Sequence, residues 1–224
     1  MIPLDLFDSL PPTTAVIREP IAPGAALLRA FAHSMDAALL QSIEAVIAQA
    51  PLRHMQTPGG YTMSVGTTSC GALGWVSDAR GYRYAAHDPV SGVAWPAMPA
   101  CFLDLAQRAA QEAGFAGFAP ESCLINTYAP GAKLSLHQDK DEKDLAAPIV
   151  SVSLGLPAVF LFGSAKRTDR PQRLLLVHGD VVVWGGPSRL AFHGVMSLAD
   201  GHHPLLGRRR INLTFRSPRL RPAP

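Results

Sequence analysis

The sequence predicts an α+β fold that is mainly β: a jelly roll, or double-stranded β-helix, supported by N-terminal helices. Three observations carry this prediction. The 224 residues, nearly half of them apolar, suffice for one domain with a substantial core. Two segments in the first half of the chain are candidate helices, one because of its helical periodicity and one because of its terminal residues. In the second half, short apolar or alternating segments are separated by turn signals, which is typical of a sandwich or barrel.

We expect a single domain, residues 1–224, with five parts in chain order. The expected parts are a lead-in and first helix (1–50), a Gly-rich aromatic segment (51–98), a second helix (99–120), the jelly-roll core (121–216) and a tail (217–224).

The helices follow from spacing and from terminal residues. Residues 1–23 carry five prolines and no clear periodicity, so they predict an extended lead-in. Ser34 is a candidate N-cap for a helix that runs to about Ala50. A second helix is expected from Pro99 to Gly114, because proline is favoured in the first turn and glycine just past the end.

The predicted strands of the core are short and are joined by turn residues. Between residues 51 and 98, aromatic residues are spread through a Gly-rich, polar stretch, which indicates short strands and loops that bind something. The strands expected in the core are Cys123–Tyr128, Ile149–Leu156, Ala158–Phe162, Arg173–Val177, Val181–Trp184 and Arg210–Arg216.

Composition narrows the function classes. The cysteines Cys70, Cys101 and Cys123 are widely spaced and form no CxxC, which argues against a disulfide framework and a zinc knuckle. No apolar run is as long as a membrane span, and the N-terminus lacks the features of a secretory signal. We therefore expect a cytoplasmic protein with no membrane segment, and a monomer. The net charge of +3 permits nucleic-acid binding without requiring it.

The triplet His137-Gln138-Asp139 is the first chemical signal. Together with the distant His193 it supplies two imidazoles and one carboxylate, the ligands of a facial iron site that leaves positions open for a co-substrate and O₂. Residues two apart on an extended strand point to the same face, so His137 and Asp139 can bind one ion. The triplet alone is weak evidence, because such triplets occur by chance.

The segment Arg210–Arg216 is the second signal, because its polar and apolar residues alternate without exception. If the apolar face packs against the helices, two arginines turn inward, where they need an anion. A dicarboxylate gripped by both guanidinium groups would satisfy them. The alternative is an edge strand with its polar face in water; together, the two signals favour the anion site. The polar face consists of Arg210, Asn212, Thr214 and Arg216.

These motifs resemble the AlkB-type Fe(II)/2-oxoglutarate dioxygenases of bacteria, direct-reversal DNA repair enzymes. The resemblance runs from about Leu4 to Arg216. It implies oxidative demethylation of N1-methyladenine and N3-methylcytosine in single- or double-stranded DNA, with RNA left open, using Fe(II), 2-oxoglutarate and O₂ and releasing formaldehyde, succinate and CO₂. The segments that carry it are Pro58–Val65, Asn126–Glu142, Pro148–Pro157, His178–Gly186 and Arg210–Arg216.

The resemblance also implies roles for single residues. The iron ligands would be His137, Asp139 and His193. The arginines would bind the two carboxylates of 2-oxoglutarate, and three other residues would supply its remaining polar contacts. The implied 2-oxoglutarate contacts are Asn126, Tyr128, Arg210, Asn212 and Arg216.

Residues 51–98 would then form a nucleotide-recognition segment. Trp75 would sandwich a flipped-out base together with the imidazole of His193, and Asp141 would lie beside the exocyclic amine of that base. Tyr82 and Arg167 would contact the nucleotide or its backbone.

Two other interpretations stay open at the level of the residues. One is an oxygenase of the same chemistry that acts on a protein or a small molecule. The other is a non-redox metal-binding jelly roll or hydrolase, which Arg210 and Arg216 disfavour because such a site needs no dicarboxylate grip. The remaining histidines have no spacing that competes with the triad, so we expect them to be surface or hydrogen-bonded residues, with His178 at a turn.

Overall fold

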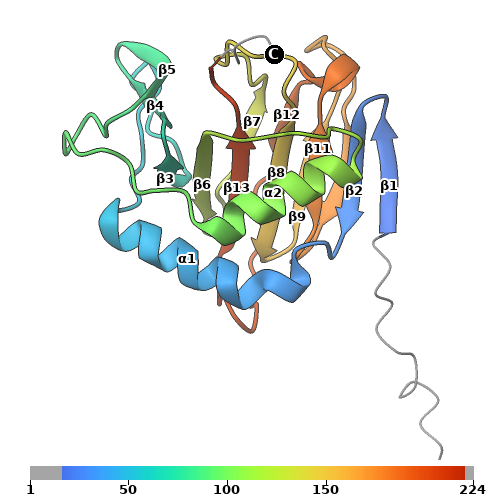
Figure 1. Ribbon diagram of the computed structural model, residues 1–224, viewed down its shortest axis with the longest axis horizontal. Coiled ribbons are helices and arrows are strands. Elements are labelled where there is room, and N and C mark those ends of the chain that lie inside the picture. Colours follow the sequence, from blue (N-terminus) through green and yellow to red (C-terminus); the bar gives the residue numbers. More distant parts are fainter. Residues whose placement is uncertain (1–16, 220–224) are drawn as a thin grey trace, which may run out of the picture.

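A seven-stranded antiparallel sheet crosses the centre of the molecule (Figure 1). The computed structural model describes residues 17–219. In spatial order the sheet consists of β1 (Ile17–Ala22), β2 (Ala25–Arg29), β11 (Val181–Trp184), β8 (Ile149–Gly155), β13 (Arg210–Arg216), β6 (Ser122–Tyr128) and β3 (Gly66–Gly71).

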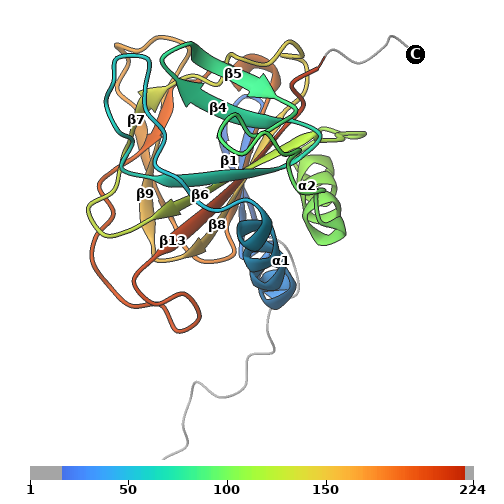
Figure 2. The ribbon, with the colours of Figure 1, turned by 90° about the vertical axis from the view of Figure 1, so that its left-hand side faces the viewer.

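A smaller antiparallel sheet faces the first one, and the two together form the predicted jelly roll. Figure 2 shows the helices on one side of the large sheet, the small sheet on the other, and a separate hairpin, β4–β5, at the top. The small sheet consists of β10 (Gln172–Leu176), β9 (Ala158–Phe162), β12 (His193–Val195) and β7 (Leu134–His137), and the hairpin of β4 (Gly74–Asp78) and β5 (Gly81–Ala85).

Two helices, α1 (Asp36–Gln49) and α2 (Ala100–Glu112), cover the outer face of the large sheet, and both lie where the sequence predicts helices. The predicted N-cap was wrong. Ser34 lies inside a short 3₁₀ turn, His33–Met35, and α1 begins at Asp36 without a side-chain cap. None of the helices within residues 17–219 has the length and apolar character needed to span a bilayer.

The expected lead-in is extended in the part that the structure describes, but it belongs to the large sheet, which the sequence did not indicate. Strands β1 and β2 form a hairpin at the edge of the large sheet, and β2 pairs with β11. The hairpin turns at Gly24, whose φ of 74° lies in the left-handed region that glycine tolerates best. Pro20 in β1 obscured the strand in the sequence, but an edge strand accommodates a proline. Residues 1–16 lie outside the described part.

Strand β13 separates two apolar cores. Its apolar side chains, Ile211, Leu213 and Phe215, belong to the core between the large sheet and the helices. Its polar side chains therefore face the small sheet, beside the second core, which contains Phe160 and Trp184. This arrangement confirms the inward-facing arginines and excludes the edge-strand alternative, because β13 pairs with both β6 and β8.

Two further boundaries differ from the expected parts. Strand β3, expected within the recognition segment, pairs with β6 and belongs to the large sheet. The start of the tail packs on the core, since the Ser217 hydroxyl donates to the Ala119 carbonyl at 2.9 Å. The end of the tail, residues 220–224, lies outside the described part.

Candidate metal centre and anion site

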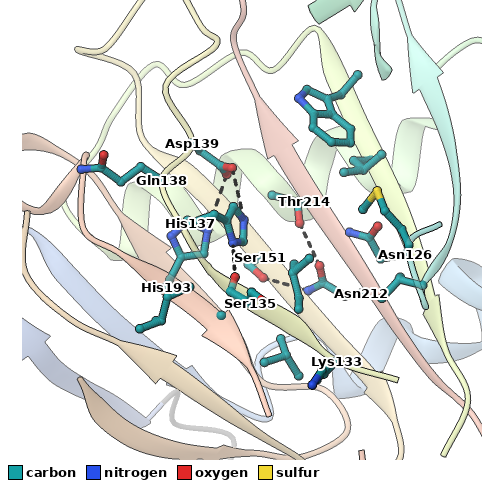
Figure 3. A pocket seen from close by; sticks show the side chains of 18 of the residues that line it. Asn126, Lys133, Ser135, His137, Gln138, Asp139, Ser151, His193, Asn212 and Thr214 are labelled. Atoms are coloured by element: carbon teal, nitrogen blue, oxygen red, sulfur yellow. Dashed lines mark hydrogen bonds and ion pairs between the residues drawn. The ribbon is translucent and has the colours of Figure 1, made fainter. Parts of the chain in front are cut away.

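A cavity of about 890 Å³ opens between the two sheets (Figure 3). Its walls come from β6, β8 and β13 of the large sheet and from β7 and β12 of the small one, and its mouth includes residues of the β4–β5 hairpin. The fold therefore brings side chains from distant parts of the chain, between Thr57 and Arg216, into one cavity. All the predicted site residues line this cavity.

The predicted triad assembles at one end of the cavity. His137 and His193 are direct partners across the antiparallel pair β7–β12, and their ring centroids are 4.4 Å apart. Asp139 lies two residues beyond the end of β7, so the expectation of one continuous strand was wrong. Its carboxylate nevertheless faces both rings, with Oδ1 3.7 Å from His137 Nε2 and Oδ2 3.8 Å from His193 Nε2.

Backbone carbonyls set the tautomer of both imidazoles. His137 Nδ1 lies 2.9 Å from the Ser135 carbonyl and His193 Nδ1 lies 3.0 Å from the Ala191 carbonyl. A carbonyl oxygen only accepts, so each Nδ1 carries a proton, and each Nε2 is the nitrogen that faces Asp139 and can bind a metal. Metal-binding histidines are oriented in this way.

The charges of the triad also suit a divalent cation. Burial, with a smaller contribution from His137, lowers the pKa of His193 to about 4, so this imidazole is neutral near pH 7. Burial alone would raise the pKa of Asp139, but Arg216 and the two histidines together hold it below its ordinary value. Two imidazoles and one carboxylate form the donor set that Fe(II) takes in facial sites.

Arg216 holds the carboxylate of Asp139 rather than standing free. Its Nε and Nη2 atoms lie 2.8 and 2.6 Å from Asp139 Oδ2. Because Arg216 binds Oδ2, the other oxygen, Oδ1, stays turned toward His137. A carboxylate held in this way can bind a metal through one oxygen. The predicted contact of Arg216 with a 2-oxoglutarate carboxylate stays a prediction.

Arg210 is a buried cation with two unpaired donors among the described residues. Its Nη2 donates to the Ser153 hydroxyl at 2.9 Å, and its guanidinium lies 4.9 Å from the centroid of the Tyr128 ring. Its Nε and Nη1 have no hydrogen-bond partner among the described residues, and burial lowers its pKa. Buried donors without partners lower the stability of a fold. A carboxylate bound in the cavity would accept hydrogen bonds from both Nε and Nη1.

Strand register places the other predicted contacts beside Arg210. In the β13–β6 pair, Arg210 lies opposite Tyr128 and Asn212 lies opposite Asn126. Asn212 Nδ2 donates to the Ser151 hydroxyl at 2.8 Å. Ser151 and Ser153 of β8 were not among the predicted site residues, although serines that alternate with valines in a buried strand are a detectable signal of a polar inner face.

The predicted recognition residues meet at the mouth of the cavity. Trp75 of β4 stacks on Tyr82 of β5, with ring centroids 5.5 Å apart and planes inclined by 13°. The Trp75 indole N–H donates to Asp141 Oδ2 at 2.9 Å. Tyr82 is 48% exposed, and the exposed Arg167 has its guanidinium 5.7 Å from the centroid of the Phe192 ring. An aromatic platform, a carboxylate and a cation thus surround the opening.

A second cluster joins His33, Asp36 and His178, which no sequence spacing revealed. His178 Nδ1 accepts the Gly155 backbone N–H at 3.0 Å, so its Nε2 carries the proton and faces Asp36 Oδ2 at 3.4 Å. His178 therefore has no lone pair to offer an ion in this arrangement. The cluster ties α1 to the end of β8, in agreement with the expectation of a hydrogen-bonded histidine.

Comparisons with known proteins agree with this geometry. A family model described as the 2OG-Fe(II) oxygenase superfamily matches residues 24–216. Over 213 residues the chain is 58% identical to the alpha-ketoglutarate-dependent dioxygenase AlkB of Escherichia coli (strain K12), covering 95% of this chain and 97% of that protein.

More distant relatives carry names that state a substrate. The chain is 31% identical to the tRNA demethylase abh1 of Schizosaccharomyces pombe over 66% of this chain and 53% of that protein. It is 34% identical to the DNA N(6)-methyladenine demethylase ALKBH1C of Arabidopsis thaliana over 64% of this chain and 37% of that protein. The solved structure of OsALKBH1 superposes with a TM-score of 0.79 at 28% identity, covering 90% of this chain and all of that one.

Proposed function

Because this chain belongs to the 2OG-Fe(II) oxygenase superfamily, we propose that it oxidatively removes alkyl groups from N-alkylated bases in DNA or RNA, as a direct-reversal repair enzyme. The proposed substrates are N1-methyladenine and N3-methylcytosine. The observation that carries the proposal is one cavity that joins the His-Asp-His triad to an aromatic mouth. Family membership also argues against a non-redox metal-binding jelly roll or hydrolase, because this superfamily uses Fe(II) and 2-oxoglutarate.

Two groups of residues would hold the cofactor and the co-substrate. His137, Asp139 and His193 would bind Fe(II), and Arg210 would receive the far carboxylate of 2-oxoglutarate on its unpaired donors. When bound, iron with 2-oxoglutarate and O₂ supplies the oxidising power that converts an N-methyl group to a hydroxymethyl group, which leaves as formaldehyde. The chain itself orients the reactants and excludes water.

The mouth of the cavity would bind the extruded base. Trp75 supplies one face, and Asp141 supplies an acceptor for the exocyclic amine. For the second face, the sequence pointed to His193. Its side chain, however, is only 7% exposed, whereas that of His137 is 34% exposed. We therefore assign the second face to His137. A methyl group on a pairing nitrogen lowers the cost of extrusion, so unpaired lesions are the easiest substrates.

The partners follow from the same site. Tyr82 and the exposed Arg167 would contact the nucleic-acid backbone, because both border the opening and one is cationic. We propose that the protein acts as a monomer, because residues of a single chain line the whole cavity. We also propose that the protein acts in the cytoplasm, because its widely spaced cysteines favour a reducing compartment.

The test uses the metal-free protein, reconstituted anaerobically with Fe(II) and 2-oxoglutarate. A single-stranded oligonucleotide with one N1-methyladenine is added, air is admitted, and the oligonucleotide is analysed by mass spectrometry. We expect its mass to fall by one methylene unit. The loss should require 2-oxoglutarate and should disappear in His137→Ala, while His202→Ala, a histidine outside the cavity, keeps it.

The same experiment separates the alternatives. If 2-oxoglutarate is consumed while the oligonucleotide stays intact, nucleic acid is not the substrate, and a protein or a small molecule takes its place. If the mass falls without 2-oxoglutarate, the proposed chemistry is wrong.

A further inference from the structure

Glu142 is a buried carboxylate, 6% exposed, that lies beside the metal site but does not line the cavity. It has three partners from distant parts of the chain. The Tyr84 hydroxyl donates to Oε1 at 2.5 Å, and Arg189 Nη2 donates to Oε2 at 3.0 Å. Arg216 Nε, which also bonds Asp139, lies 3.5 Å from Oε1.

Arg189 uses its whole guanidinium fork within this network. Besides the bond to Glu142, its Nη1 donates to the Asp139 carbonyl at 2.7 Å and its Nε donates to the Ala147 carbonyl at 2.9 Å. Asp139 is therefore held twice: its main chain is bound by Arg189, and its carboxylate by Arg216. Glu142 also contacts both arginines, and it does so through its carboxylate alone.

The charges in the network balance. Asp139 and Glu142 offset the two arginines, and all four side chains are buried. Among the described residues Glu142 is the one carboxylate that pairs with Arg189, so removing its charge would leave this buried cation unpaired while it holds the main chain of Asp139. Loss of such outer partners typically weakens metal binding about 10- to 100-fold.

The network also reaches the mouth of the cavity. Tyr84 lies on β5, directly opposite Trp75 in the β4–β5 register. A hydrogen bond from Tyr84 to Glu142 therefore connects the hairpin that carries the aromatic platform to the residues that hold Asp139. A movement of this hairpin relative to Glu142 would strain or break that bond.

We propose that Glu142 and Arg189 are positioning residues for the metal ligand Asp139, and that Tyr84 couples this pair to the β4–β5 hairpin. Nucleic acid bound under the hairpin then tightens metal binding, and by linkage the metal tightens nucleic-acid binding by the same factor. The coupling rests on the proposed function, whereas the positioning of Asp139 rests on the contacts of the network.

The positioning is tested by binding rather than turnover. Mn(II) is titrated calorimetrically into metal-free protein at fixed 2-oxoglutarate, and thermal unfolding is recorded in parallel. We expect Glu142→Gln and Arg189→Lys to weaken Mn(II) binding about tenfold or more. Lysine keeps the charge of Arg189 but cannot reproduce its three bonds.

Asp180→Asn is the matched control. Asp180 is a buried carboxylate, 1% exposed, that binds Arg29 at 2.9 Å and lies outside the cavity. This variant should lose stability but keep Mn(II) affinity within about twofold, since it removes a buried ion pair without touching the site. Wild-type affinity in both Glu142→Gln and Arg189→Lys, or an equal loss in Asp180→Asn, would overturn the positioning role.

The coupling is tested by repeating the Mn(II) titration with a saturating single-stranded oligonucleotide that contains N1-methyladenine. Wild-type protein should bind Mn(II) several-fold more tightly with the oligonucleotide, and Tyr84→Phe should lose this gain. If the oligonucleotide binds but gives no gain, or if Tyr84→Phe keeps the gain, the coupling is wrong. If it does not bind at all, the proposed function fails with the coupling, and the Mn(II) affinity of Glu142→Gln still decides the positioning.

Discussion

Each histidine of the triad is oriented by a carbonyl two residues earlier in the chain, Ser135 for His137 and Ala191 for His193. The same local bond therefore prepares both imidazoles, although they come from different strands. Arg210 is the complementary case, because the fold buries its guanidinium and leaves two donors without partners among the described residues. Two features of single residues therefore suit the site to ligands: the orientation of the two histidine rings and the unpaired donors of Arg210.

Arg210→Lys should raise the KM for 2-oxoglutarate. Lysine keeps the charge but loses the planar fork, and a hydrogen bond to a charged group contributes about 1.5–3 kcal/mol, or roughly 10- to 100-fold. Succinate formation at varied 2-oxoglutarate measures the effect. Arg208→Lys is the control, because Arg208 pairs with Asp200 on the surface. An unchanged KM in Arg210→Lys would remove Arg210 from the co-substrate site.

Asp141→Asn should lower kcat/KM for an N1-methyladenine oligonucleotide by about tenfold, the loss expected when an amine loses a charged acceptor. Asparagine can still accept the Trp75 indole N–H, so the platform keeps its support. The KM for 2-oxoglutarate should not change, which separates base recognition from damage to the site. If repair proceeds at the wild-type rate, Asp141 does not recognise the base.

The strand pair β7–β12 depends on a close approach at Gly194. A Cβ atom at this position would lie 2.7 Å from the Leu134 carbonyl oxygen and 3.2 Å from the Leu136 nitrogen. The β7 backbone would therefore have to move, and β7 carries His137 opposite His193. Packing between two strands thus decides the spacing of two candidate metal ligands.

Gly194→Ala should weaken Mn(II) binding and lower the Tm, because overpacking of this kind typically costs about 1–3 kcal/mol. Gly66→Ala is the matched control in β3, since the atoms nearest to its added Cβ lie 3.8 Å away. Calorimetric titration and thermal unfolding of both variants give the comparison. Equal Mn(II) affinity in the two would show that the β7–β12 spacing does not set the site.

At the scale of the whole molecule, the cavity is a junction between the two sheets. The small sheet contributes His137 and His193, and the large sheet contributes Arg210 and Arg216. Metal and co-substrate would therefore bridge the sheets. A ligand that binds only the folded state stabilises it in proportion to the logarithm of its concentration.

Saturation with Mn(II) and 2-oxoglutarate should consequently raise the Tm. At 100 times the Kd the gain is about 2.7 kcal/mol, which corresponds to roughly 5–10 °C for a chain of this size. Differential scanning calorimetry of wild type and His137→Ala, with and without ligands, measures it. The shift should vanish in His137→Ala, and a shift of full size in that variant would place metal binding elsewhere.

The sequence by itself determined the fold class, both helices, most core strands, the His-Asp-His set and the polar face of β13. These are properties of periodicity and of short motifs, which each segment expresses on its own. Only the tertiary structure placed β1 and β2 in the large sheet, paired Arg216 with Asp139, and exposed His137 rather than His193.

The tertiary structure also assembled the network around Glu142. Tyr84 lies 58 residues from Glu142 in the sequence, and Arg189 lies 47 residues from it. No local pattern relates positions so far apart, because their contact depends on the hairpin, the large sheet and the β11–β12 connection packing together. Periodicity determines which face of an element is polar, whereas the packing of elements determines which polar groups meet.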